Sequence, residues 1–480
     1  MIISGGENIF PLEVENVLRM NEEIVEVSVL GVPDEYWGES VQAEVVLRPD
    51  SKLTPEEIRT FRRGKIAGYK IPKKVYVWNE LPKNTAGYPL FTWTDGEQVC
   101  QKQMSLGVEK DIIQVIRSKD EECMDILKNS LKDGGCAGII LNTVARAQDF
   151  VQKLSECFPE CEMIQMHSQF IISDRAEIER EILKRAGKNS TPEQRNKLII
   201  VGTQVLEQSL DIDFDVMITD LCPMDLLLQR IGREHRHKGR KRPLCLQKAN
   251  CYVLTETRVV YDKWLLQRTA DKLPEYFCLP DDIPVYVQYV YAEPNEDEKN
   301  DLWDEYMRHL EKLEEDAKRF RVGEPVCEEE DNPEFDSIKG WLNNTSAELT
   351  DAAALASVRS GSPAIEVLVL QKKGEDICFL PWQYEGKRVP ADNIPSEEAK
   401  EILKQRLRLS SIFSKEYNYK EVLQKLRDDT DQYFAQWQYA PKLREELVLL
   451  LDENFYTELN GYDLHYDKRT GLSSREEEKN

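Results

Sequence analysis

Hydrophobic residues follow two different periods in residues 88–292 of this chain. Short apolar runs such as GIILNTV and KLIIVGTQ alternate with longer segments such as ARAQDFVQKLSECF, where apolar residues recur every three or four positions. A short continuous apolar run predicts a buried strand, and the longer period predicts an amphipathic helix. Strands that alternate with helices pack as a parallel sheet with helices on both faces, so this region is predicted to be an α/β domain.

One of these helices has predicted ends. The strand EMIQMHS precedes the segment SDRAEIEREILKRAG, and further strands are predicted in DVMITDL and NCYVLT. Ser173 suits an N-cap, because its hydroxyl can accept a hydrogen bond from a free backbone N–H. Gly187 suits the C-terminal end of the same helix.

Residues 1–87 have a different pattern. PLEVENVLRMN and TPEEIRTFRRGKIAG predict helices, and EVSVLGV and SVQAEVVLR between them predict strands. Thr54 followed by Glu57 is a capping box that opens the second helix. These residues are therefore predicted to form a small α+β module.

The remaining chain divides into two parts. Residues 293–337 are acidic and partly helical, which predicts a connector. In residues 338–480, AIEVLVLQ and ICFLPWQ predict strands, and SEEAKEILKQRLRL and YKEVLQKLRDD predict helices. This last part is predicted to be a separate small α/β domain.

Composition narrows the location and the partners. The sequence has no signal-peptide pattern, no apolar run near the roughly 20 residues that span a bilayer, and eleven scattered cysteines. These features predict a cytoplasmic protein without membrane contact and with free thiols. The net charge is −24, so any nucleic-acid contact needs a local basic patch. RIGREHRHKGRKR, residues 230–242, supplies one, and its end, 236–242, is predicted to be a solvated loop that adds phosphate attraction.

Polar residues follow three of the predicted strands of the α/β domain. In open α/β sheets, ligands bind beyond the carboxyl ends of the strands. The candidate ligand-binding residues at these ends are Asn142, Thr143, His167, Ser168, Thr203 and Gln204.

A second candidate site lies in DLLLQRIGREHRH, which carries Gln229, Gly232, Arg233 and Arg236. On a helix the two arginines would share one face, and paired guanidiniums suit the charge of a triphosphate. Asp211, upstream, could accept a hydrogen bond from a ribose hydroxyl. The alternative interpretation is surface charge on an amphipathic helix.

These segments resemble a known family. GTQVLEQSLDIDFD followed by QRIGREHRH resembles the last two motifs of superfamily-two helicases. ILNTVARAQ, MHSQFIISDRAEIE and the tail segment AALASVRSGSPAIEVLVLQ resemble the CRISPR-associated helicase-nuclease of type I systems. The resemblance covers residues 88–480 and implies a second RecA-like lobe over 88–292, a connector over 293–337 and the family's C-terminal domain over 338–480. In antiviral defence the family translocates on DNA and unwinds it with energy from ATP.

The resemblance also implies roles. Arg233 and Arg236 would be arginine fingers that reach ATP held by a first lobe, while Gln229, Gly232 and Asp211 would contact the nucleotide. The six strand-end residues would contact single-stranded DNA. Gln169 and Glu234 depart from the family's usual arginine and leucine.

Several family motifs are not found in the sequence. It contains no G-x-x-x-x-G-K-[ST] loop for phosphates, no D-E-x-D/H box for magnesium and no His-Asp pair for a nuclease. The prediction is a truncated helicase, inactive alone and without a metal site of its own. ATP and magnesium would be held mainly by a first lobe on another chain, and a CRISPR surveillance complex is a further expected partner.

The front module resembles a different family. MIISGGENIFPLEVENVL, GVPDEYWGESVQAEVVL and LPKNTAG are similar to the C-terminal domain of acyl-CoA synthetases. The resemblance places Gly5 and Gly6 near a pantetheine channel, and Tyr88 where the family has a catalytic lysine. The two resemblances meet at Gly87–Tyr88 without a linker, which predicts a fusion of two modules that fold separately.

Two alternative functions remain. One is a non-enzymatic subunit that binds single-stranded DNA or the surveillance complex, and the other is a fragment of an acyl-CoA ligase. Tyr419, Trp437 and Tyr439 could stack on bases, although core packing is the favoured interpretation for all three.

Overall fold

The computed structural model divides the chain into two compact units, Met1–Glu109 and Lys110–Asn480. The second unit is described at residues 110–207, 210–255, 260–319, 365–392 and 394–476. The first is described at 2–4, 7–9, 11–19, 21, 23–34, 38–48, 51–60, 70–78, 90–94 and 99–103. Gly5, Gly6, Gly87 and Tyr88 therefore lie outside the described residues. The boundary between the two resemblances stays a prediction.

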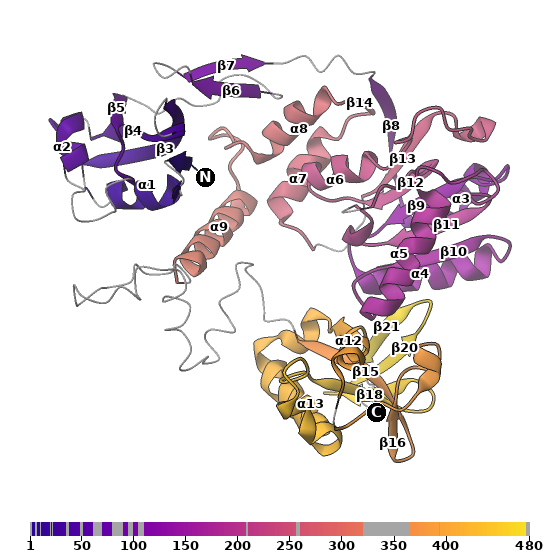
Figure 1. The fold of residues 1–480 in the computed structure, drawn as a ribbon. Helices are drawn as coiled ribbons and strands as arrows, with labels where there is room; N and C mark the ends of the chain where they lie inside the picture. The colour runs from indigo at the N-terminus through magenta and orange to yellow at the C-terminus, as the bar shows by residue number, and fades with distance from the viewer. Residues whose placement is uncertain are drawn as a thin grey trace. The chain divides into compact units, whose positions relative to one another are not determined.

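The first unit is a small α+β module (Figure 1). Its five-stranded sheet has the order β2-β1-β4-β3, with β5 parallel to β4. The strands are β1 (Ile2–Ser4), β2 (Glu7–Ile9), β3 (Ile24–Asp34), β4 (Gly38–Leu47) and β5 (Lys74–Trp78), and the helices are α1 (Pro11–Arg19) and α2 (Pro55–Thr60). The strands β6 (Leu90–Thr94) and β7 (Val99–Gln103) form a separate hairpin.

The predicted capping box is confirmed. Thr54 lies directly before α2, and its Oγ1 accepts from the Glu57 backbone N–H at 3.3 Å. The Glu57 carboxylate accepts in return from the Thr54 backbone N–H at 2.8 Å. Each side chain thus satisfies a backbone donor that the first turn leaves free.

The second unit begins with a seven-stranded sheet of order β10-β11-β9-β12-β13-β8-β14. All neighbours are parallel except β14, which pairs antiparallel with β8 at the edge. The strands are β8 (Asp111–Ser118), β9 (Cys136–Ile140), β10 (Glu162–Met166), β11 (Leu198–Gly202), β12 (Val216–Asp220), β13 (Ala249–Leu254) and β14 (Tyr276–Leu279). This confirms the predicted parallel-sheet α/β lobe.

Helices cover both faces of this sheet. One hydrophobic cluster joins it to α3 (Cys123–Ser130) and α4 (Val144–Cys157). The other joins it to α5 (Ile172–Ala186), α6 (Met224–Ile231), α7 (Lys263–Lys272) and α8 (Asp282–Tyr291). The central strands β9, β11 and β12 are buried along their whole length, as expected for strands that are covered twice.

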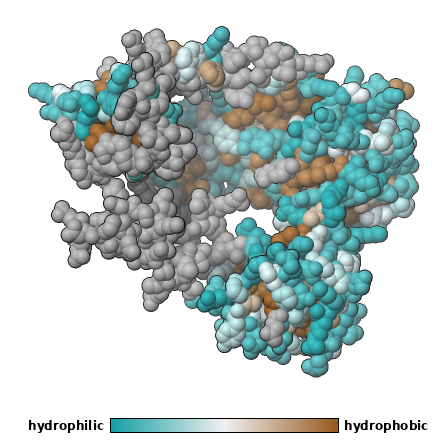
Figure 2. All heavy atoms as spheres, viewed as in Figure 1, coloured by the Kyte–Doolittle hydropathy of each residue, from teal (hydrophilic) through white to brown (hydrophobic). Residues whose placement is uncertain are grey.

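An acidic helix and a smaller domain follow. The connector region contains α9 (Asp301–Arg319). The C-terminal domain has β15 (Glu366–Lys373), β16 (Asp376–Cys378), β17 (Arg406–Arg408) and β18 (Val448–Leu451) in one sheet. A second sheet contains β19 (Tyr456–Leu459), β20 (Tyr462–Asp467) and β21 (Gly471–Glu476), and the helices are α12 (Ser396–Leu403) and α13 (Glu416–Phe434). Hydrophilic residues cover most of the face of this domain seen in Figure 2.

Two helix ends differ from the predictions. α5 starts one residue before Ser173, with Ile171 as its N-cap, because Ile171 is anchored in the hydrophobic core of the C-terminal domain. The predicted helix SEEAKEILKQRLRL ends at Leu403, and Arg406–Arg408 pair with β15 instead. Gly187 ends α5 as its C-cap, as predicted. The position favours glycine, because a Cβ there would meet the Leu183 carbonyl oxygen at 2.2 Å.

Candidate nucleotide and nucleic-acid interface

The strand-end candidates lie at one edge of the parallel sheet. β11 lies between β9 and β10, and Gly202 is in register with both Ile140 and Met166. The residues that follow these strands, Asn142, His167 and Thr203, are therefore neighbours along the carboxyl edge. The Thr203 backbone N–H donates to the Met166 carbonyl at 3.3 Å, which ties two of the strand ends together.

Asn142 points into the lobe rather than out of it. The residue is 4% exposed. Its Nδ2 donates to the Leu221 carbonyl at 2.8 Å, and its Oδ1 accepts from Arg230 Nη1 at 3.1 Å. Because both polar atoms have interior partners, Asn142 shapes the edge from inside, and the direct DNA contact expected from the sequence has no support in this position.

Arg230 is the centre of that interior network. Its side chain is fully buried, and its Nε donates to Glu207 Oε2 at 2.7 Å. Nη1 also reaches Thr219 Oγ1 at 2.9 Å. Burial raises the pKa of the Glu207 carboxyl, and the positive charge of Arg230 opposes that shift. A buried ion pair with these hydrogen bonds fixes the loop after β11 against the end of β12.

Three of the remaining candidates line this edge less deeply. Ser168 is exposed, and Thr143 is half-buried as the N-cap of α4, accepting from the Arg146 backbone N–H at 3.2 Å. Gln204 is half-buried and donates to Tyr261 Oη at 2.8 Å. Thr203 itself is 3% exposed, so its side chain faces the interior.

His167 is sealed inside the protein. It is 0% exposed, and its ring stacks on Phe170 with the centroids 4.5 Å apart. Nδ1 accepts from the Gln169 backbone N–H at 3.1 Å. Burial lowers the pKa of the imidazole to about 3, so the ring is neutral near pH 7. The buried ring gives no support to a side-chain contact with a phosphate, and the contact of His167 with DNA stays a prediction.

Arg233 and Arg236 do not lie on one helix face as expected. α6 ends at Ile231 with Gly232 as its C-cap, and His235 has a φ of +49°. The chain turns because Phe214 forms a backbone bridge with Glu234. This bridge joins the arginine segment to residues just before β12, and so brings Arg236 to Asp211.

The two arginines have different surroundings. Arg233 Nη2 donates to the Glu207 carbonyl at 2.7 Å, while its buried Nε has no hydrogen-bond partner among the described residues. Burial lowers the pKa of Arg233, and the nearby charge of Arg236 adds to that shift. Arg236 is 44% exposed and its Nε donates to Asp211 Oδ1 at 2.8 Å. Gln229 is exposed nearby in sequence, at the end of α6.

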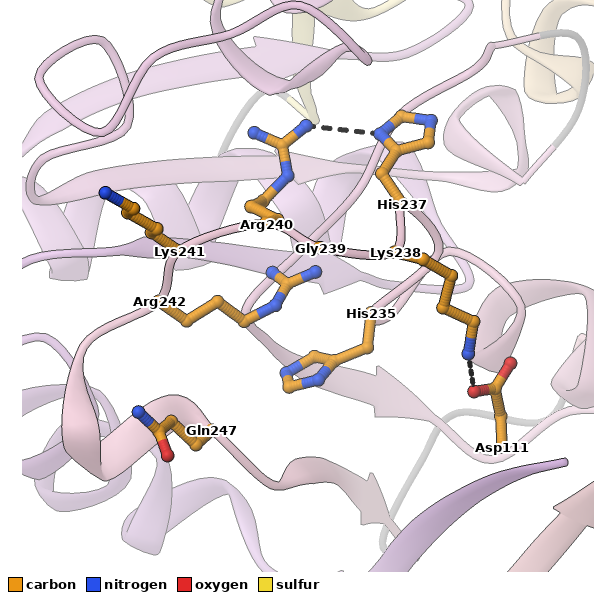
Figure 3. A pocket seen from close by; sticks show the side chains of 9 residues that line it. All are labelled: Asp111, His235, His237, Lys238, Gly239, Arg240, Lys241, Arg242 and Gln247. Atoms are coloured by element: carbon orange, nitrogen blue, oxygen red, sulfur yellow. Dashed lines mark hydrogen bonds and ion pairs between the residues drawn. The ribbon is translucent and has the colours of Figure 1, made fainter. Parts of the chain in front are cut away.

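The basic run after Arg236 is a loop, as expected, with Lys238 and Lys241 exposed, but two of its arginines are not solvated. Arg240 and Arg242 have side chains only 8% and 6% exposed, and both pair with the fully buried Asp213. Arg242 also contacts Asp215. The segment lines a cavity of about 550 Å³ (Figure 3). The two aspartates precede β12, so they draw the arginines inward at the amino edge of the sheet.

Neither of these two charged networks was predicted from the sequence. Arg230 sits in DLLLQRI, and its buried position follows the helical period of the leucines. That spacing could have identified Arg230 as a buried residue. A buried arginine requires a partner, so an interior ion pair could then have been predicted. Asp213 and Asp215 alternate with buried residues in DIDFD, which is a weaker signal.

The three aromatic residues considered for base stacking differ in their burial. Trp437 is 2% exposed and packs on Phe434, so core packing is confirmed for it. Tyr419 is partly buried against the core, but Tyr439 is 74% exposed, which contradicts the predicted core position.

Among the described residues, no group of His, Cys, Asp or Glu side chains could hold a metal ion. None of the described helices combines the length and apolar character of a membrane span.

Comparison with known proteins relates two segments of this part of the chain to one family. Residues 133–239 match the protein-family model described as CRISPR-associated nuclease/helicase Cas3, C-terminal, and residues 359–472 match the Cas3 C-terminal domain. Residues 88–480 resemble the C-terminal half of Cas3. A Cas3 nuclease/helicase of Streptococcus thermophilus is 36% identical over 411 residues, which are 82% of this chain and 44% of that protein. The chain thus spans less than half of this relative.

Solved structures have the same fold. A crystal structure of a CRISPR-associated protein aligns with a TM-score of 0.67 at 25% identity, over 88% of this chain and 46% of that one. T. fusca Cas3 with AMPPNP aligns with a TM-score of 0.66 at 22% identity, over 87% of this chain and 48% of that one.

The front module matches a second family. Residues 13–87 match the AMP-binding enzyme C-terminal domain. A long-chain-fatty-acid–CoA ligase of Bacillus subtilis is 48% identical over 87 residues, which are 18% of this chain and 16% of the ligase.

Proposed function

We propose that the Cas3-like part of this chain is the second RecA-like lobe of an ATP-dependent DNA helicase, together with its C-terminal domain. The observation that carries the proposal is the placement of Arg233 and Arg236. The backbone bridge between Phe214 and Glu234 holds this segment beside Asp211, with guanidinium groups and a carboxylate together at the end of α6.

The arginines fit a triphosphate. Arg233 is partly buried, and Nη2 to the Glu207 carbonyl is the one hydrogen bond of its guanidinium among the described residues, so other donors remain for ligand oxygens. Arg236 is exposed and can exchange Asp211 for a phosphate. Two guanidiniums would stabilise the charge that spreads over a transferring phosphoryl group. Asp211, released from Arg236, would accept from a ribose hydroxyl, and Gln229 and Gly232 would complete the contact with the nucleotide.

ATP, with magnesium, would be held mainly by a first RecA-like lobe supplied by another chain. ATP supplies the free energy for movement along DNA. The residues of this chain would bind the DNA strand at the carboxyl edge of the β-sheet, where Ser168 is exposed and Thr143 and Gln204 are half-buried. Hydroxyl and amide groups suit phosphate oxygens, which fix the position of a strand without reading its sequence.

A direct test mixes this chain with a fragment that contains only a first helicase lobe. Phosphate release is followed with and without single-stranded DNA. DNA-stimulated release in the mixture, and in neither part alone, is the expected result. Release that the chain does not increase contradicts the proposal.

A second candidate is a binding subunit without turnover. The carboxyl edge can bind DNA whether or not a first lobe is present, and one similar solved structure is that of a CRISPR RNA-guided surveillance complex, pre-nicking. Binding of labelled single-stranded DNA or of a surveillance complex, with no ATPase in the mixture, would favour this candidate.

For the front module we propose no ligase activity in this chain, because a domain of this kind acts on an adenylate that another domain holds.

A further inference from the structure

The loop that carries Ser168 is held by the C-terminal domain. Gln169, the next residue, donates from Nε2 to the Arg408 carbonyl at 2.8 Å, and its own carbonyl accepts from the Leu472 backbone N–H at 2.7 Å. The Ile171 side chain is fully buried within the hydrophobic core of the C-terminal domain. Residues 169–174, which we call the seat segment, are therefore held by the C-terminal domain, and their side-chain hydrogen bonds to it span 208 to 295 residues of sequence.

Asp174 fixes the far end of the seat segment. It is 1% exposed and accepts three hydrogen bonds from the C-terminal domain. The donors are Gln383 Nε2 at 2.6 Å, Tyr466 Oη at 2.7 Å and Trp382 Nε1 at 3.2 Å. Tyr466 Oη also accepts from the Ile171 backbone N–H at 3.1 Å. One tyrosine hydroxyl thus joins the carboxylate to the backbone of the seat segment.

Gly471 allows the closest approach between the two parts. It lies at the start of β21 with a φ of +69°, and a Cβ there would meet the Gln169 carbonyl oxygen at 2.3 Å and His167 Cε1 at 2.9 Å. A side chain at position 471 must therefore displace the Gln169 backbone on one side of Ser168 and the His167 ring on the other. Nearby, Gln148 Nε2 donates to the Thr470 carbonyl at 2.8 Å, so α4 is fastened to the same turn.

We propose that the C-terminal domain positions Ser168 for contact with a single-stranded DNA backbone, with Gln169, Asp174, Tyr466 and Gly471 as the positioning residues. This inference rests on the proposed function, because it assigns the means by which the carboxyl edge is kept ready to bind. Ser168 is exposed while residues 167 and 169–171 are all buried, so the burial of its neighbours directs it outward. A phosphate contact gains affinity when the contacting group is already held in place.

The test compares two glycine variants of the full chain. Gly471→Ala and Gly461→Ala both place a side chain at a positive φ, +69° and +75°, in the turns on either side of β20. Only position 471 meets the lobe, since nothing lies within 4 Å of a Cβ at position 461. The backbone strain is therefore matched, and the contact with the seat segment is the difference. Affinity for a labelled oligothymidine strand is measured by fluorescence anisotropy, and hydrogen exchange is measured over residues 167–172.

Gly471→Ala should weaken DNA binding by about threefold to tenfold, the value of one hydrogen bond, and should speed amide exchange in the loop. Gly461→Ala should leave both close to the parent values. Ser168→Ala should weaken binding by a similar factor, and adding it to Gly471→Ala should cause no further loss, because the contact is already gone. A role in folding alone would not produce this non-additive result.

The other outcomes are decisive as well. If the parent chain does not bind the strand, the proposed function fails and this inference fails with it. If the parent binds and Gly471→Ala matches Gly461→Ala, or if its effect adds to that of Ser168→Ala, only the positioning role is overturned. If Gly471→Ala does not fold, Tyr466→Phe replaces it, since it removes the hydroxyl and keeps the ring. Tyr456→Phe on the adjacent strand β19, at a residue that is 51% exposed, is then the control.

Discussion

Asp213 holds the main chain of Arg236 in place. Asp213 Oδ1 accepts from the Arg236 backbone N–H at 2.9 Å, and the Asp213 side chain is fully buried between Arg240 and Arg242. The proposed arginine finger thus starts from a fixed backbone position, although its own side chain is 44% exposed. A buried carboxylate with two cationic partners can do this where an exposed pair cannot.

Removing Asp213 should destabilise the second unit strongly. Asp213→Ala leaves two buried guanidiniums without their shared partner, so the free energy of unfolding should fall by about 3–5 kcal/mol. Asp211→Ala is the control: Asp211 is 54% exposed and pairs with Arg236, and its loss should cost less than about 1 kcal/mol. Urea unfolding of the full chain, followed by tryptophan fluorescence, measures both. Equal effects would contradict the difference in burial.

The chain alone should not hydrolyse ATP, with or without single-stranded DNA. Its sequence contains no P-loop and no magnesium-binding box, and an arginine finger acts only on a nucleotide that is already held. Phosphate release by the purified chain is the measurement. DNA-stimulated release that disappears in Arg233→Ala would refute this prediction.

In a mixture with a first-lobe fragment, Arg233 and Arg236 should affect turnover more than DNA binding. Stabilisation of transition-state charge appears in kcat, and one arginine finger contributes about 10³ to 10⁵ in rate. The double Arg→Ala variant should therefore lose nearly all ATPase while its affinity for DNA changes little. Lys241→Ala, an exposed position in the same basic run, serves as the control. Parent-like ATPase in the double variant would remove both arginines from the catalytic role.

Acid should weaken the second unit through His167. Burial lowers the pKa of this imidazole from 6.5 to about 3. Between these values the unfolded chain binds a proton that the folded chain does not. Stability should therefore be complete above pH 6.5 and fall as the pH decreases toward 3, by at most about 1.4 kcal/mol per pH unit. Urea unfolding of the parent and of His167→Gln at pH 7.5 and pH 5.5 isolates this contribution, because other groups titrate in both. The parent should lose more stability than the variant over that interval.

The front module should form no acyl adenylate. The front residues match only the C-terminal domain of AMP-binding enzymes, and the resemblance implies that Tyr88 stands where acyl-CoA synthetases have a lysine. Tyr88→Lys should restore nothing, since a lysine needs a bound adenylate to stabilise. Pyrophosphate exchange with acetate, benzoate and palmitate is the measurement, and exchange with any of them by the parent chain would contradict this prediction.

The α/β class, most strands and helices of the lobe and the two family resemblances could be predicted from the sequence alone. These features depend on local periods and short motifs. The strand β9 includes the start of GIILNTV, a short continuous apolar run, and ARAQDFVQKLSECF forms a helix because side chains three or four positions apart share a face. The capping box at Thr54 was predictable for the same reason, since its partners lie three residues apart. Strand β8 (Asp111–Ser118) was not predicted.

Which site residues face solvent depended instead on tertiary packing. Asn142 and His167 ended in the interior, Arg240 and Arg242 joined Asp213, and the arginine segment turned after Ile231. Each outcome depends on a partner far away in sequence. Arg230 lies 88 residues from Asn142, and Tyr466 lies 292 residues from Asp174. A local pattern carries no information on such pairs, because the free energy that fixes them arises when packing excludes water from both members at once.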